Sequence, residues 1–201
     1  MSFQDKLLDS FIAFEQVIDL DNPIHTDRKN ALKRFESKGF PTKKDELWKY
    51  TSLKSITQKD YSLSVKNNPN VGLKDIKKYS INDIDSYKIV FVDGVFNPFL
   101  SNTTHDGMDV CVLSAALSKS KYKKTINKYF NNIVPDDQSL ASLNTSYTQE
   151  GAYIHIPKSV LPEDPVQILH FSSGKNKPLW LQPRNIIIVE ENARVEIIER
   201  H

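Results

Sequence analysis

The sequence predicts an α+β protein in which helices come first and layered β-strands fill the C-terminal half. Apolar residues recur at helical spacing in the N-terminal part of the chain. The last quarter, Asn144 to His201, holds four short segments rich in Ile and Val and separated by turn-forming residues. Two of them, Val166 to Phe171 and Ile186 to Val189, are nearly apolar on both faces, so we expect cover on both sides. An unfinished apolar pattern directly before His201 leads us to expect that this layered structure continues beyond it.

Composition narrows the class of protein. The chain has 201 residues, a hydrophobic content of 39%, a charged content of 26% and a net charge of +2. These values are typical of a globular protein and do not call for nucleic acid or an anionic membrane as a partner. A single cysteine, Cys111, excludes an internal disulfide framework. Because neither a secretion signal nor a long apolar run is evident, the expected location is the cytoplasm, without membrane contact.

The N-terminal helix is expected over Phe3 to Leu20. Its apolar residues share one stripe, which consists of Phe3, Leu7, Phe11, Phe14 and Ile18. Such a stripe can bind a partner or cover the protein's own core, and we favour the core. Leu20-Asp-Asn-Pro23 should end the helix.

Two more helices are expected before residue 51. The first spans Thr26 to Lys38, with Thr26 as N-cap and Gly39 at its C-terminal end. The second is a short helix over Thr42 to Tyr50. Trp48 in this helix is either a stacking platform for a ligand or an anchor for the helical region, and the anchor is favoured.

The middle of the chain is mixed. Ser52 to Ser86 resembles a linker, with a turn at Asn67 to Asn70. Lys88 to Leu100 predicts a β-hairpin with a two-residue Asp93-Gly94 turn. Val110 to Leu113 predicts a strand in which Cys111 is a small buried side chain and not a reactive thiol. Ser114 is then expected to cap a helix.

A basic segment follows at Lys119 to Lys128. It holds five lysines, with Tyr122 among them and Tyr129 directly after the last. Lysines mixed with aromatic residues can bind single-stranded nucleic acid. A solvated helix face is the favoured interpretation, since specific binders usually carry a wider basic surface. Pro135 to Gln138 should form a loop that leads into the β-segments.

The sequence carries no established catalytic motif. It lacks a glycine-rich phosphate loop, Cys-x-x-Cys, His-Glu-x-x-His and Gly-x-Ser-x-Gly. Its five histidines are His25, His105, His155, His170 and His201. The last three lie in β-segments and could line up as metal ligands, but half-buried rings bound to backbone are favoured. No catalytic, cofactor-binding or metal residue is therefore assigned, and the protein is not expected to be an enzyme.

Several stretches carry a resemblance to a known family. The first group is Arg28, Ala31, Phe35, Gly39-Phe-Pro-Thr42 and Trp48-Lys-Tyr-Thr51. The second is Phe91-Val-Asp-Gly94-Val-Phe96 with Leu100-Ser101. The third is Leu143-Asn-Thr145, Gly151, Ile154-His-Ile-Pro157-Lys158, Pro165 to Phe171 and Pro183-Arg-Asn-Ile-Ile-Ile-Val189. In this order they resemble the SufB/SufD family of iron–sulfur cluster assembly proteins, and more closely its SufD members.

The resemblance implies a fold and partners. It implies an N-terminal helical region over residues 1–60, a mixed connecting region with a hairpin and a basic helix over 61–138, and the first rungs of a right-handed parallel β-helix over 139–201. It also implies the N-terminal portion of a non-catalytic scaffold that pairs with a SufB-like subunit. A SufC-like ATPase would be contacted mainly by a C-terminal part absent from this chain. The iron–sulfur cluster would be handled by the assembled complex, with no cofactor held by this portion.

Other interpretations stay open at this point. The strand stack leaves pairing with a second copy of the chain open. A β-helix that binds or cleaves polysaccharide is the first alternative function, although such proteins are usually secreted. A single-stranded nucleic-acid-binding module that uses Lys119 to Lys128 is the second.

Overall fold

The computed structural model describes residues 1–18, 20–21, 24–63, 71–81, 84–103, 107–135, 137–172 and 177–201. Its helices are α1 (Phe3–Glu15), α2 (His25–Lys38), η1 (Glu46–Trp48), α3 (Lys54–Thr57), α4 (Leu73–Tyr79), α5 (Leu113–Ser118), α6 (Ser120–Tyr129) and α7 (Ser139–Tyr147). Its strands are β1 (Tyr87–Val92), β2 (Val95–Phe96), β3 (Asp109–Val112), β4 (Ala152–Ile156), β5 (Val166–Phe171), β6 (Ile186–Val189) and β7 (Ile197–Arg200). The predicted α+β class is confirmed. Across these residues, no helix is both long and apolar enough for a transmembrane span.

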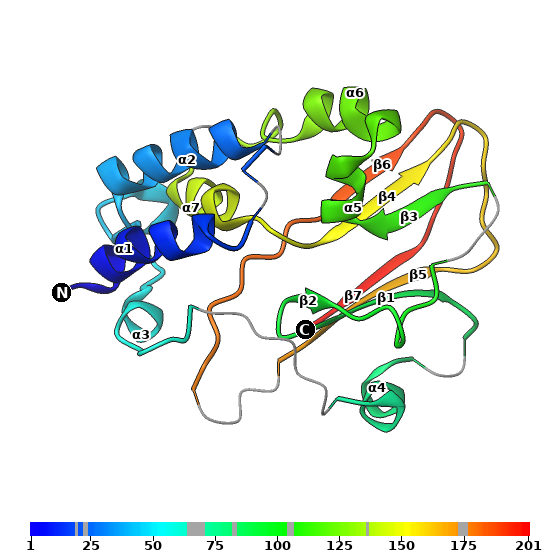
Figure 1. Ribbon diagram of the computed structural model, residues 1–201, viewed down its shortest axis with the longest axis horizontal. Coiled ribbons are helices and arrows are strands. Elements are labelled where there is room, and N and C mark those ends of the chain that lie inside the picture. The colour runs from blue at the N-terminus through cyan, green and yellow to red at the C-terminus, as the bar shows by residue number, and fades with distance from the viewer. Residues whose placement is uncertain are drawn as a thin grey trace.

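Helices α1, α2 and α7 lie together on one side of the two sheets (Figure 1). The predicted apolar stripe of α1 faces this cluster, where Phe3 and Leu7 pack with Phe35 of α2 and Leu143 of α7. The Ser2 hydroxyl accepts a hydrogen bond from the backbone N–H of Asp5 at 3.1 Å, which caps the start of α1. The favoured role of the stripe, covering the protein's own core, is thus confirmed.

Several predicted helix boundaries are wrong. Helix α1 ends at Glu15, not Leu20, and α2 begins at His25, with Thr26 inside it and Ile24 at the N-cap position. The expected helix over Thr42 to Tyr50 is reduced to the single turn η1, although the Asp45 carboxylate accepts hydrogen bonds from the N–H and hydroxyl of Thr42, as at the start of a helix. Gly39 does end α2, at φ 68°.

The anchoring role expected of Trp48 falls to a different tryptophan. Trp48 is half-buried and belongs to none of the apolar clusters formed by the described residues. Trp180 instead packs edge-on against Phe3, with ring centroids 4.9 Å apart. The backbone N–H of Trp180 donates to the carbonyl of Ser62 at 3.0 Å, which ties the strand region to the helical side.

The strands form two sheets, ordered β2-β1-β5-β7 and β3-β4-β6 among the described residues. Their facing sides bury a shared apolar core that includes Ile89, Val110, Ile154 and Ile168. Helices α5 and α6 cover the outer face of β3-β4-β6, where Tyr153 packs with Leu113, Tyr122 and Ile126. Helix α4 covers part of the outer face of the other sheet. The expectation of cover on both faces is therefore confirmed for β5. It is wrong for β6, where Ile187 and Val189 are 42% and 46% exposed.

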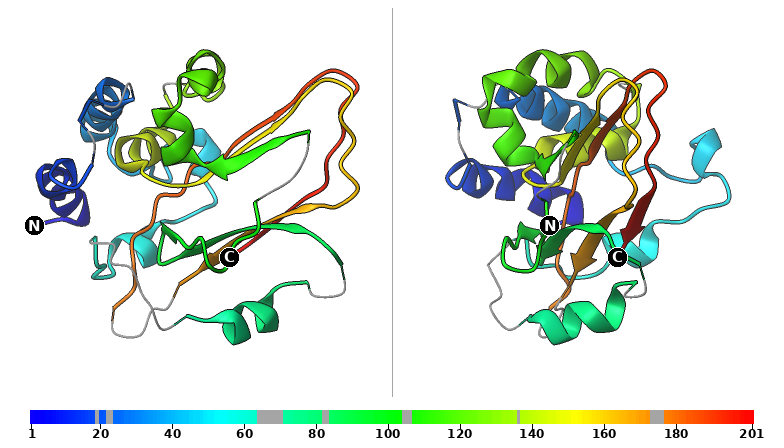
Figure 2. Two further views of the ribbon diagram at one scale, coloured as in Figure 1. Left: turned by 45° about the vertical axis from the view of Figure 1, so that its right-hand side comes forward. Right: turned by 90° about the vertical axis from the view of Figure 1, so that its right-hand side faces the viewer.

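The chain crosses between the sheets twice in the same way (Figure 2). Strand β5 follows β4 into the other sheet, then β6 returns beside β4 and β7 beside β5, with both pairs parallel. The two connections run together, since Ser159 N–H donates to the carbonyl of Glu191 at 3.0 Å and Arg194 N–H to that of Val160 at 3.2 Å. The predicted right-handed parallel β-helix is not confirmed, because antiparallel pairs β1/β2 and β3/β4 make each sheet mixed.

The predicted hairpin is confirmed. Strands β1 and β2 pair antiparallel around Asp93 and Gly94, both of which have positive φ, as a type I′ turn requires. Helix α5 begins at Leu113 directly after β3, so Ser114 is not its N-cap, and its hydroxyl donates instead to the Glu150 carboxylate at 2.6 Å. The predicted turn at Asn67 to Asn70 and part of the Pro135 to Gln138 loop lie outside the described residues.

Candidate functional site

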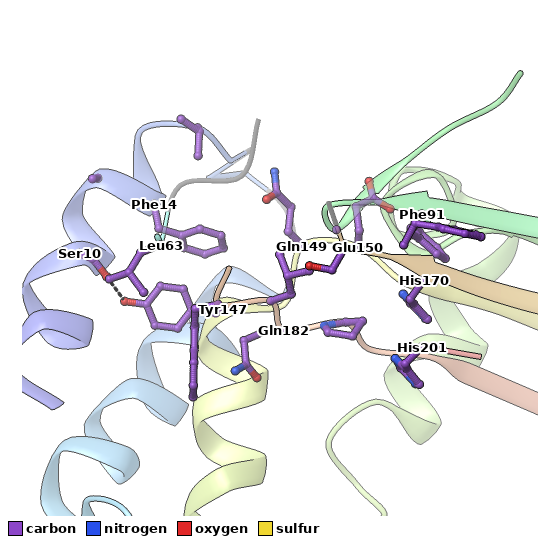
Figure 3. Close-up of a pocket in the computed structure, with 18 residues that line it drawn as sticks. Ser10, Phe14, Leu63, Phe91, Tyr147, Gln149, Glu150, His170, Gln182 and His201 are labelled. Atoms are coloured by element: carbon purple, nitrogen blue, oxygen red, sulfur yellow. Dashed lines mark hydrogen bonds between the residues drawn. The ribbon is translucent and has the colours of Figure 1, made fainter. Parts of the chain in front are cut away.

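A cavity of about 810 Å³ separates the helical side from the end of the sheet β2-β1-β5-β7. Figure 3 shows Ser10, Phe14 and Tyr147 on the helical wall, and Phe91, His170 and His201 on the sheet wall. The cavity is lined by aromatic rings with a few polar groups among them, which is the usual character of a binding site.

A ladder of stacked rings forms the sheet wall. Phe91 of β1 stacks on His170 of β5 with ring centroids 5.0 Å apart, and His170 stacks on His201 at 4.7 Å. Parallel strands in register place equivalent residues about 4.8 Å apart, so flat rings at matching positions stack along the sheet. Because side chains alternate along a strand, these rings share the face that holds Ile168 and the buried core.

Glu199 lies two residues before His201 and therefore faces the same way. Its Oε1 lies 3.4 Å from Nε2 of His170 and 3.4 Å from Nε2 of His201. The side-chain amide of Asn185 donates to the same oxygen at 2.8 Å. One potential ligand atom from each of His170, Glu199 and His201 lies within 4.8 Å of the other two. This His–Glu–His cluster is a candidate metal site.

Burial shifts the pKa of His170 in the sheet wall. Burial, followed by the neighbouring His201, lowers the pKa of His170, although Glu199 opposes this shift. Nε2 of His170 is buried and makes no hydrogen bond of ordinary geometry with any described residue. Burial thus favours the neutral form of His170, the form in which imidazole binds metal ions.

Two further titratable groups line the cavity. Burial raises the pKa of Glu150, while the hydroxyl of Ser114 donates to its Oε1 and opposes this shift. Burial raises the pKa of Tyr147 to about 12, and its hydroxyl lies 2.8 Å from that of Ser10. Both groups are therefore held in their neutral forms more firmly than in water.

The histidines of the predicted β-segments do not act as one set. His155 lies on the other sheet, with Nε2 2.9 Å from Oε1 of Glu190 and Nδ1 3.7 Å from Oδ2 of Asp109. It points to the outer face of that sheet, as Tyr153 does, whereas His170 and His201 face inward. Among the described residues, all three rings have carboxylate neighbours, and the predicted hydrogen bonds to backbone are not seen there. His105 lies outside the described residues.

Sequence reasoning missed Glu199 as a member of this cluster. The signal was present in the alternation Glu199-Arg200-His201, which places the two outer residues on one face of a strand. The sequence does not reveal that β7 pairs with β5, the strand that carries His170.

The other residues singled out from the sequence have structural roles. Cys111 is half-buried, and burial raises the pKa of its thiol, which disfavours a reactive thiolate. Tyr122 is buried, and its hydroxyl donates to Asp109 at 3.0 Å, so its ring is not a stacking surface. Lys121 of the basic segment pairs with the same carboxylate at 2.7 Å.

Comparisons with known proteins identify relatives. A family model described as the SufBD protein N-terminal region matches residues 1–168. An iron–sulfur cluster assembly SufBD family protein of Synechocystis sp. is 24% identical over 181 residues, which is 90% of this chain and 40% of that protein. The iron–sulfur cluster assembly protein SufD of Escherichia coli K12 is 26% identical over 138 residues, 68% of this chain and 29% of that protein. The chain thus spans about 40% or less of the length of these relatives.

Proposed function

The chain belongs to the SufBD family, and we propose that it serves iron–sulfur cluster assembly as the N-terminal portion of a non-catalytic scaffold subunit. Its relatives are named as iron–sulfur cluster assembly proteins, and one of them is a SufD. In this proposal the cluster is the cargo of an assembled complex and not a resident cofactor of these residues. The cytoplasmic location expected from the sequence is part of the same proposal.

The observation that carries the scaffold role is the repeated crossing between the two sheets. We interpret β4 with β5, and β6 with β7, as the first coils of a parallel β-helix. Backbone hydrogen bonds already join the connections of the two coils, from Ser159 N–H to Glu191 and from Arg194 N–H to Val160. Parallel crossovers within one sheet are almost always right-handed, which supports the right-handed form of the proposed helix.

The outer edges of the two coils are suited to continued pairing. Among the described residues, β6 pairs only with β4, and β7 only with β5. Ile187 and Val189 of β6 are 42% and 46% exposed, so apolar side chains accompany the free strand edge. Such an edge accepts further strands from the same scaffold or from a partner. In a SufB–SufC–SufD-type complex that partner is the SufB-like subunit, with the SufC-like ATPase contacted mainly by a C-terminal part outside this chain.

The non-catalytic role is supported by the state of the available nucleophiles. The thiol of Cys111 has a raised pKa, and the hydroxyl of Ser114 is held by Glu150. The nucleic-acid alternative is weakened because Tyr122 is buried and Lys121 is paired with Asp109. Scaffolding is therefore the function that the geometry supports best.

The experiment is co-purification. The chain carries an affinity tag and is co-expressed with a SufB-like subunit and a SufC-like ATPase, together and singly, and the eluate is analysed by size-exclusion chromatography with light scattering. We expect the SufB-like subunit to elute with the chain at a heteromeric mass. Ile187→Lys should weaken this complex by charging the β6 edge, whereas Leu47→Lys, at a side chain 79% exposed on the helical side, should not. Elution of the chain only as a monomer or homodimer would contradict the proposal.

A further inference from the structure

The His170–Glu199–His201 cluster has the donor set of a transition-metal site. Two imidazole nitrogens and one carboxylate oxygen are the ligands that Zn²⁺ and Fe²⁺ accept in open protein sites. Donor atoms about 2.0–2.2 Å from a tetrahedral ion lie roughly 3.3–3.5 Å from one another. Oε1 of Glu199 lies 3.4 Å from Nε2 of each histidine. Each histidine nitrogen is therefore spaced from the carboxylate as it would be around a bound ion. The two rings lie parallel and stacked 4.7 Å apart, so the exposed ring of His201 must turn before both nitrogens face one ion.

We propose that His170, Glu199 and His201 bind one divalent transition-metal ion, of the class of Zn²⁺ or Fe²⁺, at the sheet wall of the cavity. The site does not depend on the proposed scaffold function, because its ligands all come from β5 and the end of the chain beside it. Because the described residues supply three ligands, a tetrahedral ion bound here keeps one coordination position open. An open position of this kind admits water or an exchangeable ligand.

His170, the proposed ligand on β5, has a ring nitrogen that is available to a metal ion. Nε2 of His170 is buried without a hydrogen bond of ordinary geometry to any part of the chain that the structure describes. A buried polar atom left in this way costs free energy, which a bound ion would relieve.

Neighbouring groups hold the ligands in place. The amide of Asn185 donates to Oε1 of Glu199 at 2.8 Å, while its own oxygen accepts from the backbone N–H of Ala152 at 2.8 Å. Asn185 is therefore fixed at both ends and orients the carboxylate, as outer partners of metal ligands commonly do. The ring of Phe91 stacks on the other face of His170 at an interplanar angle of 10° and restricts its rotation.

The experiment titrates the chain with Co²⁺, followed by the visible d–d absorption, and with Zn²⁺, followed by isothermal titration calorimetry. We expect one equivalent to bind. His170→Ala, His201→Ala and Glu199→Gln should each weaken binding at least about tenfold, and Asn185→Ala about 10–100-fold. The matched control is His155→Ala, which removes a similarly buried histidine that also contacts carboxylates but lies on the other sheet.

Each outcome decides the proposal. A stoichiometric site lost in the ligand variants and retained in His155→Ala supports it. Binding that is absent, that is unchanged by the ligand variants, or that His155→Ala also removes overturns it. His170→Gln, which keeps the bulk of the side chain but removes the imidazole, serves if His170→Ala does not fold. Circular dichroism of every variant separates loss of the site from loss of the fold, and neither readout requires the partners of the proposed complex.

Discussion

A single methyl group at residue 151 should test how tightly the segments that lead into β4 and β6 meet. A Cβ added to Gly151 would lie 1.9 Å from the carbonyl oxygen of Arg184 and 2.5 Å from its carbonyl carbon. Carbon atoms in favourable contact are about 3.5–4.0 Å apart, so the backbone before β6 would have to move by roughly 1–2 Å. Only glycine fits this approach between the segments that lead into β4 and β6.

The structure gives the size of the effect. Overpacking a well-packed site costs about 1–3 kcal/mol. The same movement breaks the hydrogen bond from Arg184 N–H to the carbonyl of Glu150, 3.0 Å long, which adds about 1 kcal/mol. Gly151→Ala should therefore lower the free energy of unfolding by about 2–4 kcal/mol. For a chain of this size, the melting temperature should fall by about 5–15 °C.

Urea unfolding followed by tryptophan fluorescence measures this change, because Trp180 lies in the nearby aromatic cluster. Gly72→Ala is the control, since an added Cβ there meets no atom within 4 Å. It should cost at most about 1 kcal/mol, the difference between glycine and alanine at a helix N-cap. A Gly151→Ala protein within about 0.5 kcal/mol of the original would refute the close approach.

The remaining predictions concern the helical core, the buried carboxyl and the basic helix. Phe35→Ala should cost about 3–5 kcal/mol in urea unfolding because Phe35 is fully buried between α2 and α7, whereas Ile12→Ala, at a side chain 67% exposed, should cost less than about 0.5 kcal/mol. Burial raises the pKa of Glu150 above its unfolded value of about 4.3. At pH values between the unfolded and the folded pKa, folding therefore takes up a proton, and the contribution of Glu150 to stability falls as pH rises. Relative to the original chain, Glu150→Gln should gain stability as pH rises from about 4 to 7, and a difference that is flat or falls with pH would count against this. Fluorescence anisotropy with a labelled single-stranded oligonucleotide should show no tight, salt-dependent binding. Tight binding that falls with salt and is weakened by Lys123→Ala and Lys124→Ala would restore the nucleic-acid alternative.

Local signals in the sequence were reliable where the chain determines its own geometry. The stripe of α1 follows from helical spacing alone, and Asp93-Gly94 supplies the two positive φ values that the hairpin turn needs. The family resemblance likewise rested on short motifs in order. Gly151, one of its residues, has a physical reason in the close approach of Arg184.

The sheets and the candidate metal site depend on contacts between distant residues. Strand β1 pairs with β5, and β4 with β6, but periodicity along one strand does not reveal its neighbour. Three rings stack only because β1, β5 and the end of β7 lie in register, so the partner of His170 could not be chosen between His155 and His201. The expected helix after Thr42 extends for a single turn, although Thr42 and Asp45 make the bond that a capping box predicts, so this local pattern alone does not fix the length of a helix.

Hydrogen–deuterium exchange of the chain, alone and with a SufB-like subunit, tests the scaffold role most directly. If β6 and β7 are the edges to which further strands add, the amides of Ile186–Val189 and Ile197–Arg200 should gain protection in the complex, while those of Phe3–Glu15 in α1 should not change. Unchanged exchange in β6 and β7, or protection confined to the helices, would contradict the assignment of this chain as the opening of a scaffold.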